Sequence, residues 1–353
     1  MLKPEGYLPK QISNRLTVPY DLAWLTEHVL GKTVAESVFG KYRNEIHTKS
    51  KLTNALEHAE RFVEIPRVKN LSQSDFKRNF LRKGLPVIMD GAASNWECVK
   101  KWTPEWIAKT YGDDPVTLID ASPESFEDVN YVPEQTNLRA VMQAMIEGAT
   151  SKYSRFNRIL YDHPELTDDF DVKWLSARRN LLSSGKTFQV FMGAKGTRTH
   201  LHAASEHNLF VQVYGTKKWF IYPPEFDGLL SPPVKRTPYF HSEFNPEAQD
   251  YRLYPGMEGR VGYTCELRPG DVFFNPPSWW HHVVNTDCSI GVGFRWFGIV
   301  DSFKVDFMQA LLTILATNPS IFTATRLRTD FPKIFSKMNK KQKTSLEVKQ
   351  IHQ

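Results

Sequence analysis

Apolar residues recur at intervals of three and four through the first sixty residues, which is the spacing of one helix face. Two stretches carry this pattern, YDLAWLTEHVLGKTV from Tyr20 and SKLTNALEHAERFV from Ser50. We therefore expect an N-terminal helical extension over residues 1–61.

Between residues 65 and 184 the periodicity alternates between helix and strand. A helix that Ser72 or Ser74 caps should stop at Gly84, and the strand LPVIMDG follows it. A second helix should begin after Thr103, with proline at its first position, and end at Gly112. The strand DPVTLIDA and the helix LRAVMQAMIEG come next, before an irregular, acidic stretch.

From residue 187 to residue 299 the chain consists of short apolar runs separated by Gly, Pro and Asn turns. The runs are TFQVFMG, RTHLHA, NLFVQVYG, KKWFIYPP, YTCELRPG, DVFFNPP, HHVVN and SIGVGFRWF. Such regular spacing predicts a small antiparallel barrel or sandwich. Helical periodicity returns in FKVDFMQALLTILATN, so we expect a C-terminal helical segment over residues 301–353, which is a candidate surface for homodimer formation.

The composition is that of a globular protein, with 41% hydrophobic and 13% aromatic residues among 353. No run of about 18 apolar residues and no apolar signal core is present, which predicts a soluble, cytoplasmic protein without membrane association. Three cysteines without a CxxC spacing argue against a disulfide framework and against a zinc–thiolate site. A metal in this chain would therefore rely on histidine and oxygen ligands.

The net charge of +6 arises from the end of the chain, because residues 321–353 hold eight basic and two acidic residues. Such a tail can contact nucleic acid or an acidic partner, but a solvated helix end gives the same count. We favour the solvated helix, so a nucleic-acid partner is not expected.

Histidines are concentrated in two of the predicted strands. His200, His202 and Ala204 should share one strand face because side chains alternate with period two, and His281 and His282 lie on a later strand. His202 and His281 would be the minimal imidazole pair for a non-heme Fe(II) centre, whose usual third ligand is a carboxylate. On spacing alone, a buried histidine held by hydrogen bonds is the commoner outcome.

Ordered motifs around these histidines strengthen the hypothesis. They are His202-Ala203-Ala204, Asn208, Gln212, Gly215-Thr216-Lys217, Gly270-Asp271-Val272, Pro276-Pro277 and Trp279-Trp280-His281, with PVIMDGAASNW and KKWTPEWIAKTYGDDPV upstream. In this order they resemble the JmjC-like, cupin-type iron and 2-oxoglutarate oxygenases. The resemblance implies a mainly β protein with flanking helices, in which residues 62–300 form a double-stranded β-helix, or jelly roll.

The resemblance also implies roles for individual residues. His202 and His281 would bind Fe(II), and Lys217 would hold the distal carboxylate of 2-oxoglutarate, with Thr199 in support. Asn208 would lie near the co-substrate. The implied activity is oxidation of an unactivated C–H bond in a small-molecule, peptide or protein substrate.

Two positions depart from the family pattern: Ala204 stands where the metal carboxylate is expected, and Gly293 stands where an Asn is common. Radical halogenases of the wider superfamily have Ala or Gly at the first of these, so chloride could bind there and the reaction would be halogenation. The carboxylate could instead come from Glu206, through a turn at Ala204. Two further alternatives are a hydroxylase whose aspartate has been replaced by Ala204, and a non-catalytic binding module.

The assignments of His200 and Arg295 remain open. His200 could be an additional ligand, since it is expected on the same face as His202. Arg295 could hold an anionic group, although a salt-bridged core arginine is equally consistent with its apolar surroundings. His207 and His282 are expected to have packing roles.

Overall fold

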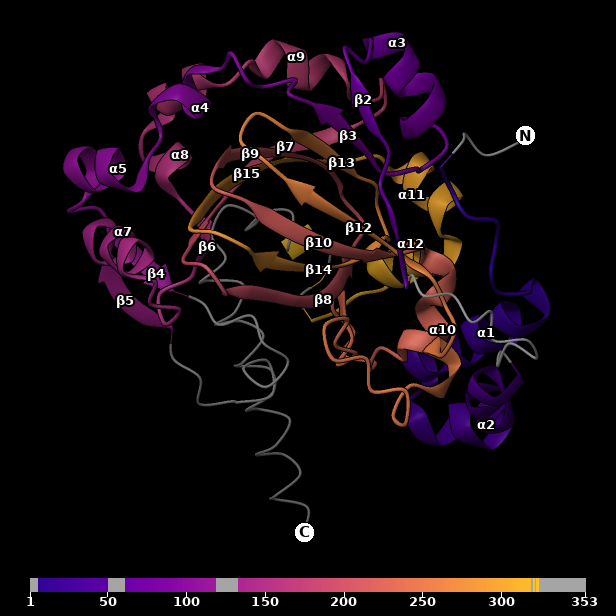
Figure 1. Cartoon of the computed structure of the whole chain (residues 1–353). Helices are drawn as coiled ribbons and strands as arrows, with labels where there is room; N and C mark the ends of the chain where they lie inside the picture. Colours follow the sequence, from indigo (N-terminus) through magenta and orange to yellow (C-terminus); the bar gives the residue numbers. More distant parts are fainter. Residues whose placement is uncertain (1–5, 50–60, 119–132, 319, 321, 324–353) are drawn as a thin grey trace.

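The computed structural model describes residues 6–49, 61–118, 133–318, 320 and 322–323. Two large mixed sheets pack face to face in its centre (Figure 1). The six-stranded sheet has the order β1-β12-β10-β14-β8-β11, and the seven-stranded sheet has the order β2-β3-β13-β9-β15-β7-β6. A separate antiparallel pair, β4-β5, lies outside them.

The strands are β1 (Phe62–Glu64), β2 (Arg67–Lys69), β3 (Val87–Asp90), β4 (Pro115–Leu118), β5 (Glu134–Asn137), β6 (Ser154–Asn157), β7 (Ser184–Gly193), β8 (Arg198–Ala204), β9 (His207–Tyr214), β10 (Lys217–Tyr222), β11 (Tyr239–His241), β12 (Gly262–Leu267), β13 (Val272–Asn275), β14 (Trp280–Asn285) and β15 (Ser289–Phe297). The helices are α1 (Asn14–Leu30), α2 (Lys32–Lys49), α3 (Gln73–Phe76), the π-helical turn η1 (Lys77–Leu81), α4 (Glu97–Lys101), α5 (Pro104–Tyr111), α7 (Leu138–Glu147), α8 (Ile159–Asp162), η2 (Pro164–Asp169), α9 (Val172–Ala177), η3 (Pro224–Phe226), α10 (Asp227–Leu230), η4 (Pro255–Met257), α11 (Ile299–Val305) and α12 (Phe307–Ile314).

Aromatic side chains from the two sheets meet between them. The ring centroid of Trp219 on β10 lies 5.1 Å from that of Phe210 on β9 and 5.1 Å from that of Phe273 on β13. These rings are buried and belong to the main apolar core. Two packed sheets with an apolar interior form the expected double-stranded β-helix.

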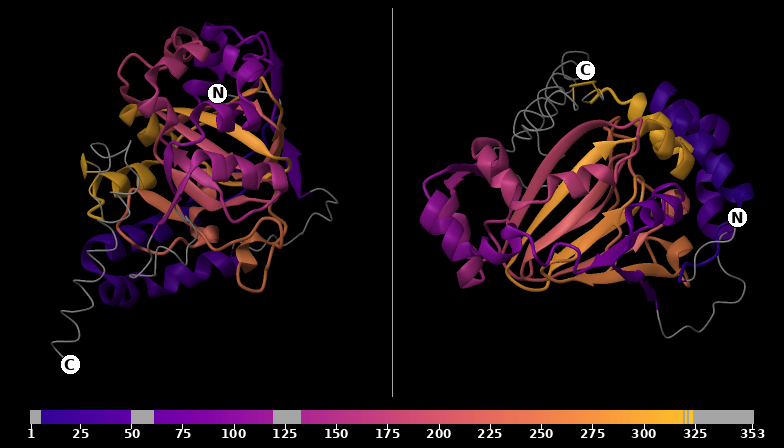
Figure 2. Two further views of the ribbon diagram at one scale, coloured as in Figure 1. Left: turned by 90° about the vertical axis from the view of Figure 1, so that its left-hand side faces the viewer. Right: turned by 90° about the horizontal axis from the view of Figure 1, so that it is seen from above.

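Helices enclose the sheets on several sides (Figures 1 and 2). The short helices α3, α4 and α9 arch over the seven-stranded sheet, and α5 and α7 lie at the end of the barrel opposite α1 and α2. Trp24 of α1 packs edge-on against Phe240 of β11, with ring centroids 5.2 Å apart. The outer face of the six-stranded sheet is thereby covered by a second apolar cluster.

Several local predictions are confirmed. Thr103 accepts a hydrogen bond from the Trp106 amide and Gly112 ends α5, as expected from the capping pattern. Ser72 caps α3, which continues into a π-helical turn. The helix expected from Ser50 to Val63 is wrong in its last two residues, because β1 begins at Phe62. Residues 50–60 of that expected helix lie outside the described residues. The basic segment beyond residue 323 also lies outside them.

None of the helices in the described ranges combines the length and the apolar character needed to cross a lipid bilayer.

Candidate metal and co-substrate site

His202 and His281 lie directly opposite each other on the neighbouring strands β8 and β14. Their ring centroids are 4.1 Å apart, so both imidazoles enter the barrel interior side by side. Trp219 of β10 stacks on His281 with a centroid separation of 5.5 Å. Three adjacent strands thus fix the positions of the two histidines.

Each of these imidazoles is held in one orientation by a backbone carbonyl. His202 Nδ1 donates to the carbonyl oxygen of His200 over 2.8 Å, and His281 Nδ1 donates to that of Trp279 over 2.9 Å. Burial lowers the pKa of His202 to about 4, and burial followed by the neighbouring His202 lowers the pKa of His281 well below its usual value. Both rings are therefore neutral at pH 7 and turn an Nε2 lone pair to the interior, which is the form that binds a metal.

A β-bulge in β8 decides which of its side chains reach the interior. His281 pairs with His202, but Val283 pairs with Thr199 where a regular ladder would place His200. The extra residue puts Thr199 on the same inner face as His202. The expectation that His200 shares that face is wrong, because the bulge interrupts the alternation; the His200 ring lies 6.2 Å from that of His282.

Lys217 is a buried amine at the deep end of the same face, with 1% of its surface exposed. It pairs with Asn285 across β10 and β14, and its Nζ donates to the side-chain oxygen of that residue. The Tyr153 ring lies 5.8 Å from Nζ, and the Tyr153 hydroxyl is 3.3 Å from that of Thr199. Burial, opposed by Cys288 and aided by the cation of Arg155, lowers the Lys217 pKa to about 7. Among the described residues no carboxylate is paired with this amine.

A second polar group projects from the facing sheet. Asn208 of β9 lies opposite Asn275 of β13 and opposite Arg295 of β15. Asn275 reaches the His281 ring with an Nδ2 to Nδ1 distance of 3.2 Å. Both amide atoms of Asn208 are buried and have no hydrogen-bond partner among the described residues. A Cβ at Gly293 would approach the Asn208 side-chain oxygen to 2.8 Å, so the glycine leaves room for this amide.

Ala204 is buried at the end of β8, two residues beyond His202. Within the described ranges, no three His, Cys, Asp or Glu side chains stand close enough together to hold a metal ion. The carboxylate of Glu206 does not join the two imidazoles in such a group; it lies 3.5 Å from the guanidinium of Arg295. Arg295 is thus a salt-bridged core arginine, the second of its two expected roles.

Other histidines have packing roles. His207 packs against both Phe274 and Trp296, with centroid distances of 5.9 and 5.0 Å. His282 is buried and lies 3.0 Å from a carboxylate oxygen of Glu247.

Sequence reasoning missed four residues near this site: Tyr153, Arg155, Asn285 and His241. Tyr153 and Arg155 come from an irregular region without a motif, and only the fold brings them to Lys217. Asn285 is the last residue of β14, the strand that carries His281. Because side chains alternate along a strand, Asn285 could have been assigned to the same face as His281 from the sequence. His241 lies on a three-residue strand that carries no periodicity.

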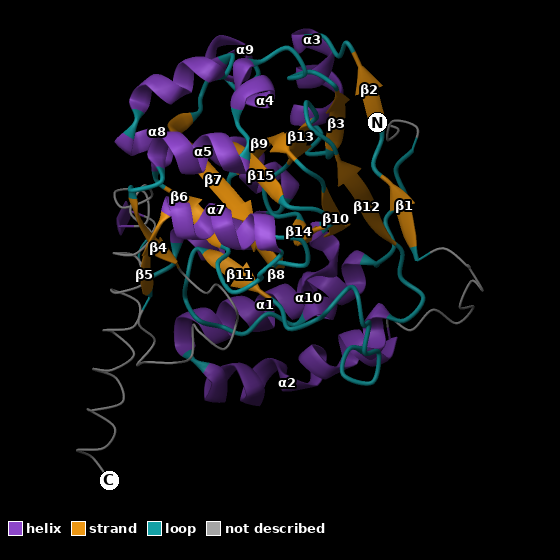
Figure 3. Cartoon of the chain, turned by 60° about the vertical axis from the view of Figure 1, so that its left-hand side comes forward, coloured by secondary structure: helices purple, strands orange, loops and turns teal. Residues whose placement is uncertain are grey.

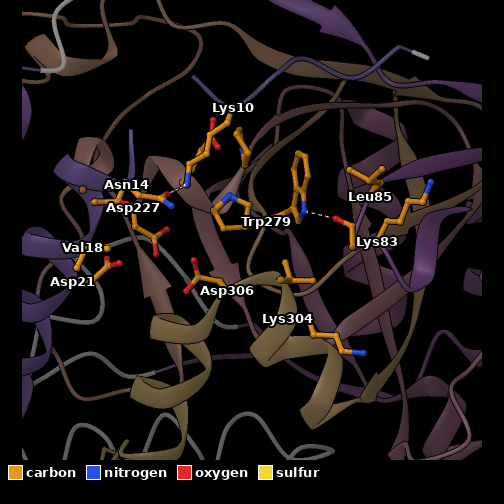
Figure 4. Close-up of a pocket in the computed structure, with 17 residues that line it drawn as sticks. Lys10, Asn14, Val18, Asp21, Lys83, Leu85, Asp227, Trp279, Lys304 and Asp306 are labelled. Carbon is orange, nitrogen blue, oxygen red and sulfur yellow. Dashed lines mark hydrogen bonds between the residues drawn. The ribbon is translucent and has the colours of Figure 1, made fainter. Parts of the chain in front are cut away.

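A separate pocket lies where α1, α10 and the start of α12 meet (Figure 4). Its lining includes the carboxyl groups of Asp21, Glu225, Asp227 and Asp306. Burial raises the pKa of Asp21 to about 7 and of Asp306 to about 6, and raises that of Asp227 well above its usual value. Asp227 Oδ1 accepts hydrogen bonds from Trp280 Nε1 over 2.6 Å and from Gln309 Nε2 over 2.7 Å. These carboxyl groups are structural neighbours of β14, and the pocket lining does not include His202, His281 or Lys217.

The family model of the cupin-like domain matches residues 73–302, which include both sheets apart from β1 and β2 and all the site residues described above. The chain belongs to this cupin-like family. Its relatives in the family carry JmjC names, so the resemblance seen in the histidine and lysine motifs is confirmed.

Three relatives illustrate the range of the family. The chain is 25% identical over 238 residues to lysine-specific demethylase 8 of Xenopus tropicalis, covering 66% of this chain and 52% of that protein. It is 23% identical over 262 residues to the 2-oxoglutarate and iron-dependent oxygenase JMJD4 of Mus musculus, covering 67% and 60%. It is 23% identical over 254 residues to tRNA wybutosine-synthesizing protein 5 of Mus musculus, covering 67% and 79%. The chain spans little more than half the length of the first of these relatives.

The residues present fit the metal and co-substrate that such relatives use. A buried amine without a paired carboxylate in the described part of the chain needs an anion, which a dicarboxylate such as 2-oxoglutarate supplies. Two neutral imidazoles with fixed tautomers suit Fe(II), and the orphaned Asn208 amide offers donors and an acceptor to a bound ligand. The protein's own ligand set is short of one carboxylate.

Proposed function

We propose that this protein is an Fe(II)- and 2-oxoglutarate-dependent oxidoreductase that acts on an unactivated C–H bond of a small-molecule, peptide or protein substrate. The observation that carries the proposal is the arrangement on one face of the six-stranded sheet. The neutral imidazoles of His202 and His281 lie side by side there, and the buried amine of Lys217, which has no carboxylate partner among the described residues, lies further along the same face. Dioxygen would be the oxidant for C–H cleavage at the bound iron, and 2-oxoglutarate would supply two of the four electrons that dioxygen accepts, as it is converted to succinate and carbon dioxide.

The chain's own residues would bind and orient these groups. His202 and His281 donate their Nε2 lone pairs, while the carbonyls of His200 and Trp279 keep each ring in place. The Lys217 ammonium pairs with the distal carboxylate of 2-oxoglutarate, and the hydroxyl of Thr199 donates to the same group. The buried rings of Trp219, Phe210 and Phe273, which pack edge to face, exclude water from this part of the barrel.

Whether the product is hydroxylated or halogenated depends on what fills the position beside Ala204. An open position would accept chloride, which restores the negative charge that an aspartate would bring. The relatives named above are not halogenases by name, so chloride remains a prediction from the sequence. A non-catalytic binding module remains the alternative from another class.

Succinate formation tests the proposal. The purified protein, supplied with Fe(II), 2-oxoglutarate and oxygen, should convert 2-oxoglutarate to succinate slowly even without its substrate. The variants His281→Ala and Lys217→Met should abolish this conversion, whereas His163→Ala, a half-buried histidine that pairs with Asp114, should retain it. Succinate formation that survives in both site variants, or that is absent from the unaltered protein, would contradict the proposal.

A further inference from the structure

The short strand β11 runs antiparallel to β8 and forms the edge of the six-stranded sheet (Figure 3). The pairing is regular: Tyr239 lies opposite Ala204, and His241 lies opposite His202. Side chains that are directly opposite in a ladder project from the same face of the sheet. Tyr239 and His241 therefore project from the same face as His202 and Ala204.

Three imidazoles consequently stand in one row across β14, β8 and β11. The ring centroids of His281 and His202 are 4.1 Å apart, and those of His202 and His241 are 5.9 Å apart. Two imidazoles that bind one ion at about 2.1 Å have ring centroids roughly 5 Å apart when their bonds to the ion are near perpendicular or tetrahedral. Both observed separations are within about 1 Å of that distance.

We propose that His241 is the third protein ligand of the metal site and takes the coordination position that a carboxylate at residue 204 would otherwise occupy. The inference rests on the proposed function, because it assumes that His202 and His281 bind the metal. The backbone pairing of β11 with β8 fixes the position of the His241 Cα beside that of His202. As the side chains stand, the planes of the His202 and His241 rings are only 23° from parallel and the described residues enclose no three-ligand site, so metal binding requires rotation of the His241 ring about its side-chain bonds.

The charges agree with this assignment. A third neutral imidazole adds no charge, so Fe(II) and a dianionic 2-oxoglutarate would form a neutral assembly with the three rings. Arg295 does not change this balance at short range because Glu206 lies 3.5 Å from it. A consequence follows for the reaction: a third imidazole leaves no place for chloride beside Ala204, so the product would be hydroxylated.

Tyr239 is the competing ligand from the same strand, because it lies directly opposite Ala204 and carries a phenol oxygen. His241 lies in the imidazole row itself, opposite His202, whereas Tyr239 lies two residues away from that row along β11. The geometry therefore favours His241, and a tyrosine variant separates the two.

The experiment measures Co(II) binding by calorimetry and by the visible absorption of the bound ion, without any turnover. The variants are His241→Ala, His241→Glu, Tyr239→Phe and His202→Ala, with His163→Ala as the control, since His163 is a half-buried imidazole that pairs with Asp114 and contacts Tyr111. His241→Ala should weaken Co(II) binding at least tenfold and change the absorption spectrum. His241→Glu should recover most of the affinity because it returns a ligand of similar reach, and Tyr239→Phe and His163→Ala should bind within twofold of the unaltered protein.

Two results would overturn the inference. If His241→Ala binds Co(II) as the unaltered protein does while His202→Ala does not, the metal site exists without His241. If Tyr239→Phe loses affinity and His241→Ala does not, the phenol is the ligand. Absence of Co(II) uptake by the unaltered protein is a different outcome, which contradicts the proposed function and the inference together.

Discussion

The side chains of Thr199 and His202 lie on the same inner face of β8, although they are three residues apart. The bulge between them supplies the extra residue that makes this possible. One strand thereby presents an imidazole beside His281 and a hydroxyl beside Tyr153. The bulge thus links the proposed metal ligand His202 to the proposed co-substrate residue Thr199.

Thr199→Val should separate these two functions. It removes the hydroxyl but keeps the branched shape, so Co(II) affinity should stay within twofold of that of the unaltered protein. The affinity for 2-oxoglutarate should fall by roughly 10- to 150-fold, since one hydrogen bond to a charged group is worth about 1.5–3 kcal/mol. Calorimetric titration of the metal-loaded protein measures both constants, and equal losses of the two would contradict the separation.

Lys217 should make 2-oxoglutarate binding depend on pH. Burial places the pKa of the free amine at about 7, and a bound carboxylate raises it because the ammonium is then paired. Affinity should therefore be highest below pH 7 and fall as the pH rises through 7 to 9, and binding at pH 8 should take up a proton.

Titration in buffers of different ionisation enthalpy measures that proton uptake. Lys217→Met is the control: its affinity should be weak and nearly independent of pH in the same range. Affinity that rises with pH in the unaltered protein would contradict the assigned role of the ammonium.

Ala204→Asp tests which ligand completes the metal site. If His241 fills the third position, an added carboxylate two residues beyond His202 must compete with that imidazole, so Co(II) affinity should change little. At an open position the same carboxylate should strengthen Co(II) binding at least roughly tenfold, since it supplies both a ligand and a negative charge. If His241 already fills the position, chloride should leave the spectrum of the unaltered protein unchanged. Spectral changes that saturate with chloride, and that disappear in Ala204→Asp, would instead favour the halogenase assignment.

The carboxyl pocket beside α12 should destabilise the fold as the pH rises. The pKa of Asp306 is raised to about 6 by burial, so the folded state holds a proton that the unfolded chain has lost above pH 4. Stability from this proton is complete below pH 4 and is lost as the pH rises through 6. Asp306→Asn keeps an oxygen to cap α12 at Gln309 and removes the charge.

Chemical denaturation at two pH values measures the effect. The Asn variant should be more stable than the unaltered protein by about 1–2 kcal/mol at pH 7.5 and nearly equal to it at pH 4.5. A variant that is less stable at pH 7.5 would show that the carboxylate form is the stabilising one.

The sequence predicts the architecture and the two imidazoles well, for identifiable reasons. Short apolar runs between turn residues define the strands of the barrel, and His202, Lys217 and His281 each lie on a strand of six or seven residues, long enough for the alternation of apolar residues to mark it. Periodicity alone misplaced His200, because a bulge is a property of the pairing between two strands and leaves no mark in the alternation of one.

Residues that reach the site from irregular segments could not be predicted. Tyr153 lies just before β6 and contacts Thr199 only through the tertiary fold. His241 lies on a strand of three residues, which is too short to show a periodicity. Its place beside His202 follows from the register in which β11 pairs with β8. Glu206, which follows the bulged strand, was weighed as a metal ligand, but its partner Arg295 comes from a distant strand.

The most direct measurement is the visible spectrum of the protein mixed with Fe(II) and 2-oxoglutarate without oxygen. Chelation of the ion by the 2-oxo acid in a histidine site gives a weak charge-transfer band. The account predicts this band in the unaltered protein, its loss in His202→Ala and His281→Ala, and its appearance only at much higher 2-oxoglutarate concentration in Lys217→Met. An unaltered protein that takes up metal but gives no band, or a band that is indifferent to Lys217→Met, would contradict the central claim.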